Sequence, residues 1–257
     1  YKAGQKHGDN GISDHSEHNI IIGVSTMAGG HDTLANNTAN LKIAIGNNAL
    51  GGNTGTTTSL TAASNTVIGH DAMKVASTAT DNVVIGYYAG NDITTSGGNT
   101  LIGKRVGYKM TTGNSSSGNT AVGAEALWEL TTGTKNVAIG WEALKNSTTG
   151  EGVTCIGYQA GTNFTTGFNS MVLGRMAQPS SATAQNEITL GDTNITKFRI
   201  PGINFFLIDN GGTPSSGQVL TADGSGEGYW ANASSGGISS DSENNTIGGT
   251  DAGAALD

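Results

Sequence analysis

The sequence has few of the residues that other proteins use for covalent cross-links, rigid turns and charged surfaces. Its 257 residues include one cysteine, three prolines and 12% charged residues, about half of the usual quarter. The single Cys155 excludes an intrachain disulfide. Its position in the apolar run Val153–Ile156 favours a small buried hydrophobic residue over a nucleophile.

Basic clusters and long apolar segments are missing as well. The net charge is −8 and lysine and arginine form no run, so we expect no groove that neutralises nucleic-acid phosphates. The longest apolar runs, such as Phe205–Ile208, are about four residues long, far short of the roughly 20 that a membrane-spanning helix needs. The sequence therefore predicts neither a nucleic-acid partner nor membrane insertion.

Glycine, in contrast, is abundant and regularly spaced. The sequence contains 41 glycines, without the Gly-X-Y triplets of collagen. Ten of them end a short apolar segment, at intervals of 17 residues six times and of 20 or 23 residues three times. These are Gly23, Gly46, Gly69, Gly86, Gly103, Gly123, Gly140, Gly157, Gly174 and Gly191. Such periodicity is the signature of a repeat protein in which each unit packs on its neighbours.

Each unit has a short strand pattern before its glycine. β-branched residues are common there, and asparagine stands four positions before the glycine in six units. Seventeen residues are too few for a strand with a crossover helix, but they suit one coil of a parallel β-solenoid. We therefore predict an all-β fold, a parallel β-solenoid (β-roll or β-helix). Its ten coils of about 17 residues would stack at about 4.8 Å into a rod about 50 Å long.

Two neighbouring apolar positions precede each glycine, although adjacent strand residues point to opposite faces. The larger residue, directly before the glycine, is expected to form a core ladder inside the coils. This ladder is Ile22, Ile45, Ile68, Ile85, Ile102, Val122, Ile139, Ile156, Leu173 and Leu190. The smaller residue, such as Ala121 or Ala138, would then lie on the outer face. A solvent-exposed sheet face would be polar. This pattern therefore predicts that the outer face packs on other copies of the chain, in a homotrimer.

The period ends at Gly191, and the sequence divides there. The expected regions are an N-terminal connector (1–18), the β-solenoid (19–195), a β-rich cap or neck with a hairpin (196–232), a linker (233–237) and the start of a second, similar module (238–257). A cap is expected because a solenoid end exposes unpaired edges and an open core. The segment from Ile238 repeats the one from Ile12, so we expect the sequence to be part of a longer modular fibre.

Asn119–Leu127 and Asn136–Leu144 are typical units. They resemble the NTAIGxxAL repeats of bacteriophage tail-fibre proteins, notably those of marine phages and cyanophages. They are more loosely similar to the head repeats of trimeric autotransporter adhesins. The resemblance covers residues 19–232. It implies the structural shaft of an extracellular, homotrimeric virion tail fibre that takes part in host attachment, with itself, host surface glycans or other tail proteins as partners. A bacterial surface adhesin or filament is the alternative.

Few residues are candidates for chemistry. Glu125, Glu129 and Glu142 lie on adjacent units near Trp128 and Trp141. Acids beside aromatic rings are what a polysaccharide-depolymerising tailspike uses to bind and cleave a sugar chain. A solvated outer edge gives the same pattern, and we favour that interpretation.

Two further groups of residues are candidates for binding. Tyr87, Trp141 and Tyr158 follow repeat glycines, and Trp141 and Tyr158, one coil apart, would stack as a sugar platform or as simple packing. His15 and His18 would each supply one ligand to a metal ion on a threefold axis. The second module lacks histidine at the matching positions, which favours the absence of a metal site. We predict no catalytic residues, no cofactor and no enzymatic activity.

Overall fold

The computed structural model describes residues 20–23, 42–51, 62–111, 116–197, 218–222, 228–232, 239–240 and 246–247. The chain forms two units, Tyr1–Phe198 and Arg199–Asp257. Every regular element within the described residues is a β-strand, which confirms the all-β prediction. The expected connector at 1–18 and linker at 233–237 lie outside the described residues.

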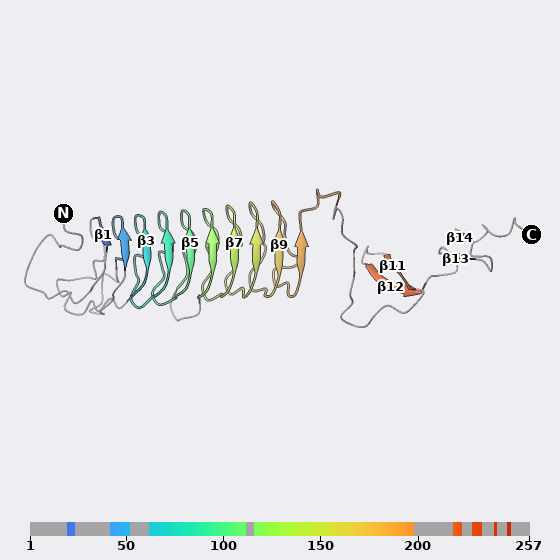
Figure 1. Ribbon diagram of the computed structural model, residues 1–257, viewed down its shortest axis with the longest axis horizontal. Helices are drawn as coiled ribbons and strands as arrows, with labels where there is room; N and C mark the ends of the chain where they lie inside the picture. Colours follow the sequence, from blue (N-terminus) through green and yellow to red (C-terminus); the bar gives the residue numbers. More distant parts are fainter. Residues whose placement is uncertain are drawn as a thin grey trace, which may run out of the picture. The chain divides into compact units, whose positions relative to one another are not determined.

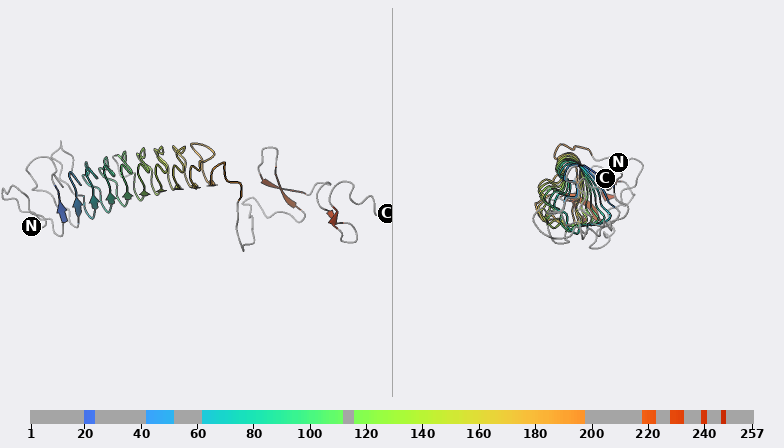
Figure 2. Two further views of the ribbon diagram at one scale, coloured as in Figure 1. Left: turned by 90° about the horizontal axis from the view of Figure 1, so that it is seen from above. Right: turned by 90° about the vertical axis from the view of Figure 1, so that its left-hand side faces the viewer.

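The first unit is a parallel β-solenoid, which confirms the predicted fold class. Ten strands of three residues form one parallel sheet in sequence order (Figure 1). They are β1 Ile20–Ile22, β2 Ile43–Ile45, β3 Thr66–Ile68, β4 Val83–Ile85, β5 Thr100–Ile102, β6 Thr120–Val122, β7 Val137–Ile139, β8 Thr154–Ile156, β9 Met171–Leu173 and β10 Ile188–Leu190. Adjacent strands pair first residue to first residue, so equivalent residues of successive coils form columns along the stack (Figure 2).

The repeat glycine turns the chain at the end of each strand. Gly103, after β5, has a φ of +145°, and a Cβ on it would lie 2.5 Å from the carbonyl oxygen of Gly123 in the next coil. Its N–H donates to the carbonyl oxygen of Ile85 in the preceding coil, at 2.8 Å. The corners therefore stack backbone on backbone with no room for a side chain. This contact, together with the positive φ, explains why glycine recurs with the period of the coil.

Other corners of the coil have left-handed backbone at residues that are not glycine. In the coil that follows β6, Glu125, Leu127 and Lys135 have φ values of 59°, 53° and 58°. Each such residue costs about 1–2 kcal/mol relative to right-handed backbone. Hydrogen bonds between coils offset this cost: the N–H of Glu125 donates to Lys104 and that of Leu127 to Ala143, at 2.9 and 3.1 Å.

A ladder of buried asparagines runs beside the sheet. Its members are Asn65, Asn82, Asn99, Asn119 and Asn136, each at most 1% exposed. The backbone N–H and the side-chain amide of Asn119 both donate to Oδ1 of Asn99, at 3.0 and 3.1 Å, and the amide also donates to the carbonyl oxygen of Gly133. Val153 ends the ladder by donating its N–H to Oδ1 of Asn136 at 2.9 Å. The asparagine before each strand thus satisfies buried polar groups of its own coil and the next.

The predicted core ladder is wrong, because the strands face the other way. From β2 to β9 the inward residue is the middle one of the strand: Ala44, Val67, Val84, Leu101, Ala121, Ala138, Cys155 and Val172, all at most 1% exposed. The residues before the glycines point outward. Ile45, Ile68, Ile85 and Leu173 are half-buried, and Ile22, Ile102, Val122, Ile139, Ile156 and Leu190 are exposed.

The turns explain this inversion. They send large side chains into the same narrow interior: Leu127, Leu130 and Leu144 are fully buried. Little volume remains opposite them for the inward strand residue, which is therefore alanine in both of those coils. In a strand of three residues the first and third share one face, so the larger third residue faces outward with the first.

The second unit contains two short antiparallel pairs. β11 (Gln218–Ala222) pairs with β12 (Gly228–Asn232) at the position of the expected hairpin. β13 (Ser239–Ser240) pairs with β14 (Thr246–Ile247). The apolar run Phe205–Ile208, which we assigned to the cap, lies outside the described residues.

Candidate functional site

The outward side of the ten-stranded sheet carries only apolar residues and threonine along its whole length. We call the first and third residues of β1–β10 the outer sheet face. Its third-position column is the set wrongly assigned to the core. Its first-position column is Ile20, Ile43, Thr66, Val83, Thr100, Thr120, Val137, Thr154, Met171 and Ile188. No charged residue occurs in either column. Extended exposed apolar patches are rare on monomeric proteins and mark interaction sites.

The first-position column was not predicted from the sequence, although the sequence contains a pattern that indicates it. Every unit has threonine or an apolar residue three positions before its glycine, and none has a charged one. Because side chains alternate along a strand, this pattern already allowed the first and third residues to face outward and the middle one to face inward. The inward column was hidden because its residues are smaller than their outward neighbours.

Trp141 and Tyr158 stack as predicted, next to the outer sheet face. Their ring centroids are 4.9 Å apart with an interplanar angle of 20°, and they are 40% and 45% exposed. Arg175, from the following coil, has its guanidinium carbon 5.8 Å from the centre of the Tyr158 ring. Tyr158 thus has an aromatic neighbour in the preceding coil and a cation in the following one, an arrangement that packing along the stack alone explains. Sugar binding at these residues stays a prediction.

Tyr87 does not join that pair. It lies three coils earlier and contacts Tyr88, with centroids 4.5 Å apart, and His70, at 5.5 Å. Tyr88 also interacts with the carboxylate of Asp71, which raises the pKa of the Tyr88 hydroxyl to about 12. The structure therefore separates the three predicted binding residues into two groups.

The three predicted acids are each paired with a lysine. Lys109 Nζ lies 2.7 Å from Glu129, one coil further on. Lys145 Nζ lies 2.9 Å from Glu125 and 2.5 Å from Glu142, and it also lies over the Trp128 ring, 4.9 Å from its centre. Lys109–Glu129 and Lys145–Glu125 connect neighbouring coils, and Lys145–Glu142 lies within one turn, as in a structural ion-pair network.

The environment of Glu142 opposes a role as general acid. Burial alone would raise its pKa, but hydrogen bonds from Lys145 and Gln159 outweigh burial and lower the pKa below the ordinary value of 4.5. A carboxyl group that donates a proton near neutral pH needs a raised pKa. The arrangement favours an ion-pair network over a catalytic acid at this position.

Acidification should weaken this network. Because the pKa of Glu142 is lower in the folded chain than in the unfolded one, its contribution to stability is fully present above about pH 4.5 and is lost as the pH falls below it. We expect Glu142→Gln to reduce stability at pH 7 by up to about 1 kcal/mol and to flatten the pH dependence between pH 5 and 3. Urea unfolding followed by circular dichroism checks both effects. An unchanged pH slope in the variant would show that Glu142 contributes nothing to it.

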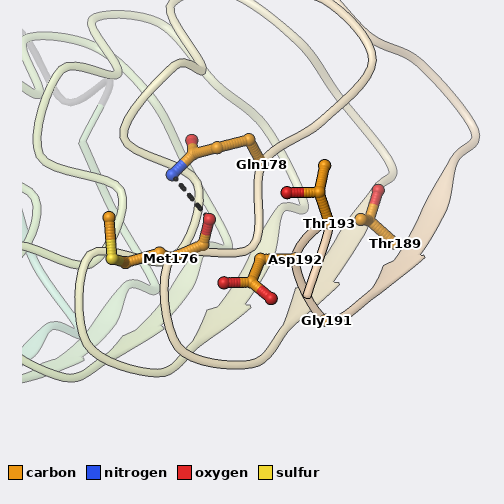
Figure 3. Close-up of a pocket in the computed structure, with 6 residues that line it drawn as sticks. All are labelled: Met176, Gln178, Thr189, Gly191, Asp192 and Thr193. Carbon is orange, nitrogen blue, oxygen red and sulfur yellow. Dashed lines mark hydrogen bonds between the residues drawn. The ribbon is translucent and has the colours of Figure 1, made fainter. Parts of the chain in front are cut away.

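A shallow hollow lies beside the last coil of the stack (Figure 3). It is lined by Met176, Gln178, Thr189, Gly191, Asp192 and Thr193. The side-chain amide of Gln178 donates to the carbonyl oxygen of Met176, at 3.4 Å. The backbone and side-chain amides of Asn194 donate to the carboxylate of Asp192 and lower its pKa. Thr189 belongs to β10, the last strand of the sheet, so the hollow lies at the end of the stack.

The remaining candidates from the sequence are the histidines near the start of the chain and the single cysteine. Within the described residues no group of three or more His, Cys, Asp or Glu side chains could hold a metal ion. His15 and His18 lie outside those residues. The same residues contain no helix that is long and apolar enough to cross a membrane. Cys155 is fully buried, and burial raises the pKa of its thiol to about 12.

Cys155 should therefore report on the opening of the core. We expect the thiol to react with a disulfide reagent such as Ellman's reagent at least about 100-fold more slowly in the native chain than in 8 M urea, because the thiolate is the reactive form. Absorbance of the released chromophore measures both rates. Comparable rates in the two states would contradict the buried position of the side chain.

No protein-family model, no curated protein and no solved structure matches this chain. Function is therefore inferred from the stacked coils, the outer sheet face and the paired side chains.

Proposed function

We propose that this chain is the structural shaft of an extracellular, homotrimeric tail fibre that takes part in attaching a bacteriophage to its host. The observation that carries the proposal is the single register from β1 to β10. Backbone hydrogen bonds between coils run along the stack, as from Gly103 to Ile85, so stretching the rod would break many of them together. A thin, stiff spacer is what a fibre shaft requires.

Three further features support this proposal. The repeated units resemble those of phage tail fibres, as Asn119–Leu127 illustrates. The pairs Lys109–Glu129 and Lys145–Glu125 join neighbouring coils, which stabilises a stack, and the pKa of Glu142 beside the aromatic pair is lowered and not raised. The outer sheet face is free of charge and suits association of copies of the chain. Host glycans and other tail proteins are the partners expected at the fibre's ends and edges.

Immunogold electron microscopy tests this location. Antibodies raised against the full chain should label fibres that project from virions prepared from a culture that encodes it. Label confined to the envelope of uninfected cells would support a bacterial surface adhesin instead. In parallel, the purified chain is incubated with envelope polysaccharide of the same host. Release of reducing ends would overturn the structural role and support a depolymerase.

A further inference from the structure

We infer that the outer sheet face is the interface through which three copies of this chain associate. The inference rests on the proposed function, which requires that copies of the chain assemble. It names the residues through which they contact each other. On the outward third-position column, Ile102, Val122, Ile139 and Ile156 on four successive coils are 36–40% exposed. In water, so continuous an apolar column is unfavourable, and burial against a partner removes this cost.

The charge distribution favours a copy of the chain as the partner. The chain has a net charge of −8, yet neither column of the outer sheet face holds a charged residue. Acidic and basic side chains lie on the turns, as in the pairs Lys109–Glu129 and Lys145–Glu125. A charged face would repel its own copy at close range, whereas a neutral one does not.

The period of the face also favours a copy. Its side chains repeat once per coil, at about 4.8 Å, along ten strands in one register. A partner that covers the whole face must offer apolar side chains with the same spacing over the same length. Another copy of this solenoid does so at every coil, while a helix, with its different repeat, would match only part of the face.

The area of the face favours three copies over two. Ten strands of three residues give a flat footprint of about 480 Å², below the roughly 800 Å² per partner of a stable pair. In a threefold arrangement each copy contacts two neighbours, so residues of the bordering column, which directly follow the repeat glycines, can enter the contact. Trp141 and Tyr158 belong to this bordering column. Their rings, 40% and 45% exposed, add apolar area to the flat footprint.

A charge-insertion experiment tests the interface. The full chain and the double variant Ile139→Lys/Ile156→Lys are compared by native mass spectrometry and light scattering at 1–50 µM, with circular dichroism as a check of folding. We expect the unaltered chain to have the mass of three copies, and the variant to dissociate at least 100-fold more readily. The matched control is Thr132→Lys/Thr149→Lys, which adds the same charge at exposed positions one coil apart on another side of the stack and should remain trimeric.

Cross-linking keeps the test decisive if the lysine variant does not fold. Ile139→Cys and, as its control, Thr149→Cys are made in a Cys155→Ala background and treated with a short bismaleimide. A covalent dimer is expected only for Ile139→Cys, because one cysteine per chain allows a single bridge between two copies. A trimer that is unaffected by Ile139→Lys/Ile156→Lys, or that cross-links equally through both positions, would overturn this interface but leave the proposed trimeric shaft intact. A chain that is monomeric or dimeric at 50 µM would overturn the trimer itself.

Discussion

Replacing Gly103 with alanine is expected to separate the stack between β5 and β6. The new Cβ would lie 2.5 Å from the carbonyl oxygen of Gly123, and the φ of +145° is one that alanine rarely adopts. Relief of the overlap requires movement of the Gly103 or Gly123 backbone, which are both fixed by inter-coil hydrogen bonds. Strain and lost packing together should reduce the free energy of unfolding by at least about 3 kcal/mol.

Gly152→Ala is the matched control for this change. Gly152 also has a positive φ, +63°, but the nearest atom to a Cβ there is the backbone nitrogen of Asn169, 4.0 Å away. Only the conformational cost of about 1–2 kcal/mol is then expected. Thermal unfolding followed by circular dichroism ranks the two variants, and hydrogen exchange at the β5–β6 pairs locates the damage. Equal losses in both would show that the conformation of glycine, and not the contact between corners, fixes the repeat.

The sequence predicted the fold because one geometric demand recurs in every coil. Gly103 and Gly123 must both be glycine for the same steric reason, so the interval between such glycines gives the number of residues in each coil. The asparagine ladder adds a second periodic demand, since Asn99 and Asn119 hydrogen-bond each other across coils. A period that contains a glycine, an asparagine and three strand residues, with no room for a helix, specifies a parallel solenoid.

The inside and outside of the strand were not predictable from residue size. Ile139 is larger than Ala138, which suggested that the isoleucine was in the core, yet Ala138 is fully buried and Ile139 is 38% exposed. The size of the residue that fits at the inward strand position depends on the side chain that the turn places opposite it. In this coil that side chain is the buried Leu144. Interpretation of the strand alone therefore assigned the wrong column to the core and missed half of the outer sheet face.

The turns themselves were hidden for a related reason. Leu127 and Leu144 have left-handed backbone, with φ values of 53° and 52°, although leucine does not favour it. Elsewhere the same position is glycine, as at Gly107, where φ is 56°. Whether leucine or glycine stands at this corner depends on the space that the inward strand residue leaves inside the coil. No single residue type therefore identifies the corner in the sequence.

The volumes of the inward strand residue and of the turn residue opposite it are coupled, and this coupling leads to a second large predicted change in stability. In the coil of β5 the inward residue is Leu101 and the corner is Gly107, where a Cβ would lie 3.0 Å from Cδ1 of Leu101. In the coil of β7 the inward residue is Ala138 and the corner is Leu144, both fully buried. A large residue on one side of the interior is thus matched by a small one on the other. Close packing of the interior makes this exchange necessary.

Ala138→Leu alone is expected to overpack the coil of β7 and to cost about 1–3 kcal/mol. Leu144→Gly alone should cost about 2–4 kcal/mol through the cavity it leaves, partly offset because glycine tolerates the left-handed φ of 52°. The double variant reproduces the pair found at Leu101 and Gly107, and its stability should return to within about 1 kcal/mol of the unaltered chain. Urea unfolding of all four chains gives the coupling energy of this cycle. If the two losses simply add, the side chains of Ala138 and Leu144 do not share one volume, and the compensation between strand and turn that shapes the core is absent from this coil.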